Sequence, residues 1–242
     1  MSLYKIPEAM DWELVGPVRV HHQGQANYVT TEEQMWILKE EDDDMSLTIA
    51  AEAVGYLLGL YLGVPLPEAR WSRRDGKTGG LSRQIKNGPS HWEPTLWDAV
   101  INQTDLGRIL ALDAIIANGD RHERNILLEE GPAPDHYTLW AIDQGAAEIS
   151  SPELLYSRDC APPKVTSELI DGFEVQLIRD EALRSANIAR NLGEDVLKHI
   201  ARHACDVSCY MCQNQLLKVL RQRCRDAPYI VEGYLNQVEA RP

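Results

Sequence analysis

One segment of the chain fixes an order of helix, charged loop and hairpin, and it constrains the fold more than any other. A helix is predicted over 104–117, because these residues fall mostly at helical spacing: Leu106, Ile109, Leu110, Asp113 and Ile116. The chain then turns through Asn118-Gly119 into a polar loop that ends at Asn125. The apolar runs 126–128 and 137–142 are expected to pair as a hairpin, which returns Asp143 to the side of Asn125.

The elements on either side of this segment differ in kind. Residues 17–40 are typical of short strands, followed by a helix over 46–63 and strands near 68–73 and 79–85. Beyond about Thr166, helices are expected over 166–178, 193–204, 207–225 and 229–239. A strand-rich first third before a helical remainder predicts an α+β, two-part fold. Asn87-Gly88-Pro89 is the predicted boundary, which gives a β-rich N-lobe at 1–88 and a mostly helical C-lobe at 89–242.

Composition narrows the classes of function. The formal charge of −13 argues against binding to the phosphates of nucleic acid or to an anionic membrane surface. The N-terminus carries acids and a proline where a signal peptide needs an apolar core, and no uncharged run reaches the ~20 residues of a membrane span. Five cysteines, an odd count without an export signal, indicate a reducing compartment, so we expect a cytoplasmic protein.

The polar residues around the hairpin suit phosphoryl transfer. Mg²⁺ is usually held by one or two carboxylates together with phosphate oxygens, and the attacking hydroxyl needs a carboxylate beside it. Asp120 is expected to orient or deprotonate the acceptor, while Asn125 and Asp143 hold the metal. Each short motif alone is an ordinary loop or turn, but their joint arrangement indicates a functional site.

The run Gly-Asp-Arg-His-x-x-Asn at 119–125, followed by Ile-Asp-x-Gly at 142–145, resembles the catalytic and metal-binding loops of the protein-kinase-like superfamily. Two branches are most similar, the bacterial HipA-like kinases and the phosphatidylinositol kinases. The compact size and the strand that begins at Gly79-Gly80 favour the HipA-like branch. The resemblance implies a bilobal kinase fold that uses ATP and Mg²⁺.

Two further residues of the loop have alternative interpretations. His122 matches a histidine that contributes to catalysis in the phosphatidylinositol kinases, and an imidazole is a common proton-transfer group. It is equally explained as a side chain that braces the loop by hydrogen bonding. Arg121 is expected to pair with a nearby carboxylate instead of contacting substrate.

The first lobe should supply a cation for the nucleotide phosphates. Lys39 ends the apolar run Trp36-Ile37-Leu38, which resembles the strand that carries the phosphate-contacting lysine of kinases. Glu52 is the single acid on the helix 46–63, and a carboxylate on so apolar a helix needs a partner, for which Lys39 is the natural choice. The alternative is that both face water.

The remaining nucleotide contacts are expected from backbone. The turn around Gly24 stands where a phosphate-covering loop is required, although it has one glycine instead of three. Gln84 and Ile85, at the end of the strand that leads to the lobe boundary, are expected to offer backbone groups to adenine. A C-terminal group of histidines and cysteines has incomplete zinc-ligand spacing, and we interpret it as buried reduced thiols and core histidines: His199, His203, Cys205, Cys209 and Cys212.

The sequence therefore predicts an ATP-dependent kinase that transfers the γ-phosphoryl of Mg-ATP to a hydroxyl acceptor, expected to be a protein Ser or Thr. Two alternatives stay open. One is a lipid or small-molecule kinase of the phosphatidylinositol type, which a basic rim around the cleft would favour. The other is a pseudokinase or toxin–antitoxin-type binding module without turnover. Two features favour it: Gln144 stands where many kinases carry phenylalanine, and the predicted phosphate-covering loop has one glycine.

Overall fold

The computed structural model describes residues 3–4, 10–18, 26–31, 34–40, 47–74, 77–85, 92–131, 133, 135–150, 175–208 and 212–239 of the 242. Seven strands lie among these described residues, all before residue 142: β1 Glu13–Pro17, β2 Ala26–Thr31, β3 Gln34–Glu40, β4 Ala69–Arg74, β5 Lys77–Arg83, β6 Ile126–Glu130 and β7 Tyr137–Ala141. The α-helices of the described residues are α1 Thr48–Leu62, α2 Asp105–Ile116, α3 Val175–Arg190, α4 Glu194–Val207 and α5 Gln213–Glu239. Short 3-10 helices span Pro94–Ala99 and Glu123–Asn125. The α+β fold class is confirmed.

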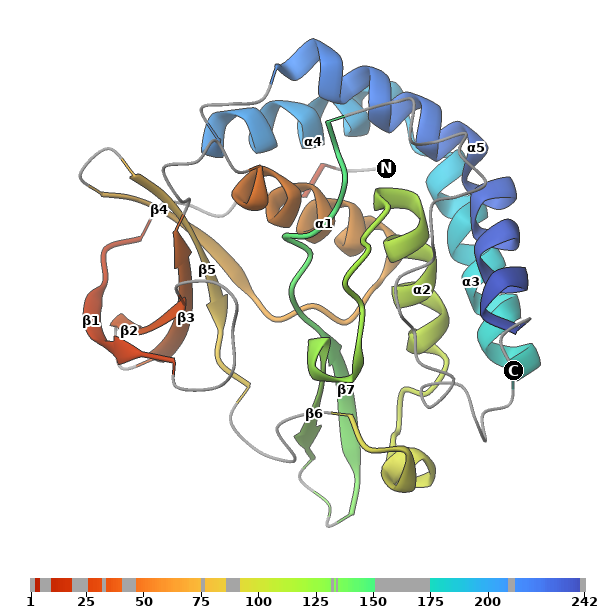
Figure 1. The fold of residues 1–242 in the computed structure, drawn as a ribbon, viewed down its shortest axis with the longest axis horizontal. Helices are drawn as coiled ribbons and strands as arrows, with labels where there is room; N and C mark the ends of the chain where they lie inside the picture. The colour runs from red at the N-terminus through yellow and green to blue at the C-terminus, as the bar shows by residue number, and fades with distance from the viewer. Residues whose placement is uncertain are drawn as a thin grey trace.

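Five strands form one antiparallel sheet in the order β1-β2-β3-β5-β4, with α1 beside it, and the β6–β7 hairpin stands apart (Figure 1). The predicted hairpin is confirmed, and its register pairs Ile126 with Ala141. Buried residues alternate with half-buried ones along both strands, so one face of the hairpin is buried: Ile126, Leu128, Leu139 and Ala141. The register places the end of β7, and hence Asp143, beside the start of β6.

Helix α1 belongs to the main hydrophobic core and not to the sheet alone. Its apolar residues are buried on almost every side, in one cluster with α2 and the C-terminal helices. The helix packs against α4, which runs along it in Figure 1, and against α2. A separate small core lies on the other face of the sheet and consists of Val29, Trp36, Leu38 and Leu81. Helix α1, which carries Glu52, is thus held in place by its packing with α2 and the C-terminal helices.

Glycines lie along the face that α1 turns toward α2, although the nearest neighbours of Gly55 and Gly59 are Gln144 and Leu66, each 2.5 Å from an added side chain. A side chain on Gly55 would lie 3.4 Å from Ile116, and one on Gly59 would lie 3.2 Å from Leu112. Gly63, which ends the helix in the left-handed conformation, similarly faces Arg108. These glycines are four residues apart along α1, and the residues they meet are four apart along α2, so one face of each helix fits the other.

The C-terminal helices differ in part from the sequence prediction. The expected helix 166–178 lies mostly outside the described residues, and the described helix continues to Arg190. Its buried face was missed because it consists largely of alanines, Ala182, Ala186 and Ala189, which give a weak periodic signal. The prediction of separate helices over 207–225 and 229–239 was wrong. A single helix, α5, passes through Pro228, and its packing along α3, α4 and α2 compensates for the lost backbone hydrogen bond.

The contact between α2 and α3 gives a test of the packing. A side chain on Gly107 would lie 2.3 Å from the carbonyl oxygen of Ile178 and 3.0 Å from the amide nitrogen of Ala182. Because both atoms are backbone, rotation of a side chain cannot relieve the clash. We expect Gly107→Ala to lower the free energy of unfolding by about 1–3 kcal/mol, measured by urea denaturation.

Gly233→Ala is the matched control, because Gly233 lies within α5 and nothing surrounds the added methyl group. This variant should gain about 0.5–1 kcal/mol, the usual preference of a helix interior for alanine. Equal stability of the two variants would show that α2 and α3 do not approach as closely as described.

The interpretation of the C-terminal histidines as core residues is confirmed, because His199 and His203 are buried, but Cys205 is only half-buried and Cys212 is exposed, so the prediction of buried thiols was wrong for Cys212. Cys205, Cys212 and Cys224 are free thiols, whereas Cys209 lies outside the described residues. No group of three or more His, Cys, Asp and Glu side chains among the described residues is placed to hold a metal ion. Burial lowers the pKa of His203 to about 4, so its ring is neutral at ordinary pH. No helix in these ranges is both long and apolar enough to cross a membrane.

Candidate active site

A lysine and two carboxylates meet between the sheet and the helical body. The Nζ atom of Lys39, on β3, lies 2.7 Å from Oε1 of Glu52 on α1 and 2.7 Å from Oδ1 of Asp143, which follows β7. The ion pair between Lys39 and Glu52 expected from the sequence is therefore present. Asp143 joins it from a segment about a hundred residues away, which makes a three-membered cluster of net negative charge.

The chain around Asp143 is fitted closely to α1. The amide of Gln144 donates a hydrogen bond to Oε2 of Glu52 at 3.1 Å, so both oxygens of this carboxylate are engaged. A side chain on Gly145 would lie 2.7 Å from Thr48, and one on Gly55 would lie 2.5 Å from Gln144. The glycine of the Asp-x-Gly motif is thus required by the approach of α1, and Gly55 makes room for Gln144.

The backbone of Asp143 and the charge of Lys39 both indicate a functional position. Asp143 has a φ of 61°, a left-handed conformation that is uncommon outside glycine and is concentrated at functional positions. Burial lowers the pKa of Lys39, but Glu52 and Asp143 raise it by more, and the net result is a pKa above its ordinary value. The lysine therefore stays protonated and offers a permanent positive charge to an anion.

Arg121 is buried beneath the polar loop and its donors are occupied. Its Nε and Nη2 atoms donate to the two oxygens of Asp113 at 2.7 and 2.9 Å. Its Nη1 atom donates to the carbonyl oxygens of Asn125 and Ile142 at 2.7 and 2.5 Å. This confirms that Arg121 pairs with a carboxylate. It also ties the end of the loop to the residue before Asp143, because one guanidinium bonds both backbones.

Asn118 and Asn125 complete the framework of the loop. Asn118 donates to Asp113 at 2.9 Å and to the carbonyl oxygen of Asp143 at 3.5 Å. Asn125 donates through Nδ2 to the carbonyl oxygen of Asp120 at 2.7 Å, so its Oδ1 atom is the one left for a cation. The amide of Ile142 donates to the carbonyl oxygen of Asn125 at 3.1 Å, which sets Asn125 beside the segment that carries Asp143.

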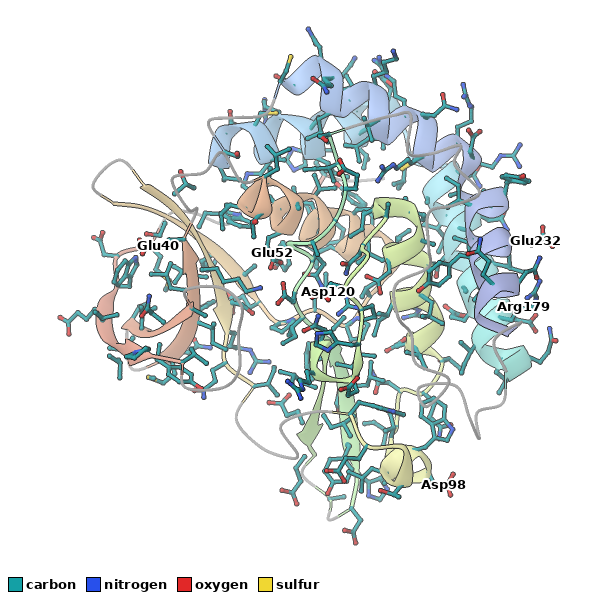
Figure 2. The ribbon with its side chains drawn as sticks, viewed as in Figure 1. Glu40, Glu52, Asp98, Asp120, Arg179 and Glu232 are labelled. Atoms are coloured by element: carbon teal, nitrogen blue, oxygen red, sulfur yellow. The ribbon has the colours of Figure 1, made fainter. Side chains whose placement is uncertain are left out.

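Asp120 and His122 lie at the exposed side of this loop. The side chain of Asp120 is 64% exposed and its Oδ2 atom is 3.8 Å from Nε2 of His122. The Nδ1 atom of His122 accepts a hydrogen bond from the amide of Arg124 at 3.1 Å, so the bracing contact considered for it is present. With Nδ1 as acceptor, the proton of a neutral ring is on Nε2, the nitrogen nearer Asp120. Figure 2 shows Asp120 and Glu52 in the middle of the view, between the sheet and the C-terminal helices.

A cleft opens beside the lysine cluster. Its empty space, with the open mouth included, is about 830 Å³. Lys39, Glu52, Asp143 and Gln144 line it as one contacting group. The rest of the lining is mostly apolar and comes from both the sheet and the hairpin: Ala26, Ile37, Leu66, Pro67, Ala69, Trp71, Leu81, Ile85, Leu127, Ala141 and Ile142, with Tyr56, Gly80, Ser82 and Arg83.

The residues predicted for the site fall into three groups. Lys39, Glu52, Ile85 and Asp143 line the cleft together. Within the described residues, the lining does not include Asp120, His122 or Asn125, which lie on the adjoining loop, nor Gln84, whose amide donates to Met35 and extends the pairing of β3 with β5. Gly24 and the boundary 87–89 lie outside the described residues, so the division into lobes at residue 88 stays a prediction.

Sequence reasoning missed the support beneath the loop. Asp113 is fully buried on an apolar helix and holds Arg121 and Asn118. The argument that assigned a partner to Glu52 applies equally to Asp113, because it too is an acid on an apolar helix. Gly55 was not singled out either, since a close approach between segments distant in the chain cannot be read from a sequence without its fold.

The oxygen atoms near the end of the cleft suit a divalent cation. Asp143 offers a carboxylate and Asn125 an amide oxygen, which are the hard ligands that Mg²⁺ prefers. Two protein ligands are enough for an ion that keeps several waters and binds phosphate oxygens besides. The donor set therefore fits Mg²⁺ carried by a nucleotide.

The antiparallel sheet with α1 beside it, the helical body and the lysine-lined cleft between them define a kinase-like fold. The crystal structure of CtkA, a proinflammatory kinase of Helicobacter pylori, has this fold, with a TM-score of 0.58 at 12% sequence identity over 97% of this chain and 98% of CtkA. HipA of the Shewanella oneidensis MR-1 toxin–antitoxin system, in complex with HipB and operator DNA, matches with a TM-score of 0.43 at 10% identity over 96% of this chain and 69% of HipA. No protein-family model and no curated protein sequence matches the chain. The fold of CtkA agrees with the kinase-like fold that the sequence resemblance implies.

Proposed function

We propose that this protein is an ATP-dependent phosphotransferase that transfers the γ-phosphoryl group of Mg-ATP to a hydroxyl group, with a protein Ser or Thr as the expected acceptor. The observation that carries the proposal is the contact of Lys39 with Glu52 and Asp143 at the end of an apolar cleft. A kinase needs a cation for the phosphates and carboxylates for the metal at this position.

The distribution of charged and apolar residues in the lining of the cleft suits one orientation of a nucleotide. The charged part of the lining, at Lys39 and Asp143, suits the phosphates, whereas Ile37 and Leu127 line the cleft from the sheet and from the hairpin and suit the two faces of a base. Lys39 is protonated because of its two carboxylate neighbours, so it contributes a fixed charge to the phosphates. Glu52, bound to the amide of Gln144, keeps this lysine in place.

The reaction uses the residues of the loop. The acceptor oxygen attacks the γ-phosphorus, the bond from this phosphorus to the bridging β–γ oxygen breaks, and ADP leaves with the electron pair of that bond. Asp120 orients the acceptor and takes the proton of the hydroxyl, with His122 beside it. Asn125 and Asp143 would hold Mg²⁺, which would neutralise charge on the phosphates. Arg121 takes no part, because its donors are occupied within the fold.

Transfer of labelled γ-phosphate from Mg-ATP tests the proposal, with the protein itself and a mixture of dephosphorylated cell proteins as acceptors. Labelled phosphoserine or phosphothreonine is the expected product. Label recovered in a lipid extract would favour the phosphatidylinositol-type alternative instead. Binding of ATP without any transfer would support a binding module, and absence of both would refute a nucleotide-dependent function.

Lys39→Met separates nucleotide binding from folding. Loss of the cation should weaken binding of a non-hydrolysable ATP analogue by at least about tenfold, measured by isothermal titration calorimetry. Lys198→Met is the control, because Lys198 is a half-exposed lysine on α4 that contacts Glu194 and lies outside the cleft. If both variants bind the analogue equally well, Lys39 does not contact the phosphates.

A further inference from the structure

The sheet and the hairpin each line one face of the proposed base position, and the strand registers show which residues adjoin those faces. On the sheet, Ile37 is directly opposite Ser82, and Arg83 is the next residue of β5. On the hairpin, Leu127 is directly opposite Trp140. Directly opposed residues of an antiparallel pair share a face, so Trp140 lies beside Leu127. Arg83 and Trp140 therefore adjoin the two surfaces that suit the base.

A contact between Arg83 and the hairpin joins these two surfaces. The guanidinium carbon of Arg83 lies 5.6 Å from the centroid of the Trp140 ring, within the range of a cation–π interaction. Its Nη1 atom lies 3.9 Å from Oε1 of Glu129, which is two residues beyond Leu127 and on the same face of β6. We call Arg83, Glu129 and Trp140 the Arg83 clasp, because one arginine of the sheet meets a ring and a carboxylate of the hairpin.

The hairpin presents its ring and its carboxylate in a fixed arrangement. Nε1 of Trp140 donates a hydrogen bond to Oε2 of Glu129 at 3.0 Å. The side chains of Arg83 and Glu129 are 28% and 24% exposed, so water and salt screen their attraction less than at an open surface. Because Trp140 and Glu129 already hold each other, the contact with Arg83 requires little further ordering of the hairpin.

The Arg83 clasp and the lysine cluster join the sheet to different parts of the hairpin. Lys39 contacts Asp143, which follows the end of β7 and lies at the proposed phosphate position. Glu129 is opposite Thr138, near the start of β7 and well before Asp143 along the chain. Arg83 therefore fixes the separation of the two surfaces where the base is placed, which the contact of Lys39 does not do.

We propose that Arg83 is a positioning residue for the nucleotide, which holds the Leu127 surface of the hairpin close to the Ile37 surface of the sheet so that both faces of the base are contacted. The inference rests on the proposed nucleotide site and adds to it the residue that sets the width of its base position. Arg83 acts through Trp140 and Glu129 and not on the reacting atoms. Its loss should therefore weaken nucleotide binding without slowing the transfer step.

Arg83→Gln removes the cation and keeps a polar side chain. We expect it to weaken binding of a non-hydrolysable ATP analogue by at least about fivefold, measured by isothermal titration calorimetry with Mg²⁺. KM for ATP should rise by a similar factor while kcat stays within about twofold of wild type, because binding to ground state and transition state is lost equally. Arg83→Lys keeps a cation at the ring and should bind the analogue within about twofold of wild type.

Two further variants connect the effect to the clasp. Glu129→Gln changes the contact from the side of the hairpin and should also weaken binding. The double variant Arg83→Gln/Glu129→Gln should bind no more weakly than Arg83→Gln, because both changes remove the same contact. Arg70→Gln is the matched control and should bind like wild type. Arg70 lies on the same sheet, pairs with the neighbouring Glu68 and is not among the described residues that line the cleft.

Each outcome decides between distinct claims. If wild-type protein binds the analogue and Arg83→Gln binds it within about twofold, the positioning role is refuted and the nucleotide site stands. Weakening that Arg83→Lys does not reverse, together with a lower melting temperature, would assign Arg83 a structural role and also refute the proposal. Equal weakening in Arg70→Gln would show a general effect of charge, with the same consequence. If wild-type protein does not bind the analogue, the proposed function fails and the role of Arg83 fails with it.

Discussion

Replacing Asp143 with asparagine should reduce γ-phosphoryl transfer by at least about 10³-fold while leaving the fold intact. The change removes the carboxylate expected to hold Mg²⁺ and the ion pair with Lys39, and it alters no volume. Asparagine tolerates the left-handed backbone of this position, with its φ of 61°. The rate is measured with labelled ATP, and the melting temperature is measured alongside it.

Asp98→Asn is the control for this variant. Asp98 is exposed in the short 3-10 helix before α2 and lies far from Glu52 and Asp120 in the view of Figure 2. The same change of charge there should leave the transfer rate unaffected. If Asp143→Asn keeps more than about a tenth of wild-type activity, the carboxylate does not hold the catalytic metal.

The second large effect concerns stability. Arg121→Met should lower the free energy of unfolding by about 3–5 kcal/mol, because it leaves the fully buried Asp113 carboxylate without its guanidinium partner. It also removes the bonds from Arg121 to the carbonyl oxygens of Asn125 and Ile142, so the loop and the Asp143 segment lose their shared support. Urea denaturation of purified protein measures the loss.

A double variant separates the buried charge from simple loss of packing. Adding Asp113→Asn removes the unpaired charge, so Arg121→Met/Asp113→Asn should be more stable than Arg121→Met alone. Arg124→Met, in the same loop but with an arginine side chain that is 60% exposed, should change stability by less than about 0.5 kcal/mol. Equal losses for Arg121→Met and Arg124→Met would mean that the buried pair does not support the loop.

The parts of the fold predicted from the sequence were those with strong local signals. The helix predicted over 104–117 is observed as Asp105–Ile116, and the hairpin 126–141 follows it as expected. Both depend on apolar periodicity close to turn residues, which acts over a few residues. The pairing of Lys39 with Glu52 followed from a different argument, the need of a carboxylate on an apolar helix for a partner.

The remainder depended on contacts between distant segments. The alanine face of α3 is buried because Gly107 allows α2 to approach it. Neither the residues of α2 nor those of α3, taken alone, indicate this contact. A proline usually ends or kinks a helix, but α5 continues through Pro228 because it packs along three other helices. Asp113 is also an acid on an apolar helix, so its need for a partner could have been predicted in the same way as that of Glu52.

A structure with bound nucleotide tests the central claim, that Lys39, Glu52, Asn125 and Asp143 form one metal–nucleotide site. Crystals are soaked with a non-hydrolysable ATP analogue and Mn²⁺, whose anomalous scattering locates the ion. We expect the anomalous peak between Asn125 and Asp143, with Lys39 in contact with a phosphate of the analogue. A nucleotide bound elsewhere, or a manganese peak away from both side chains, would contradict the account.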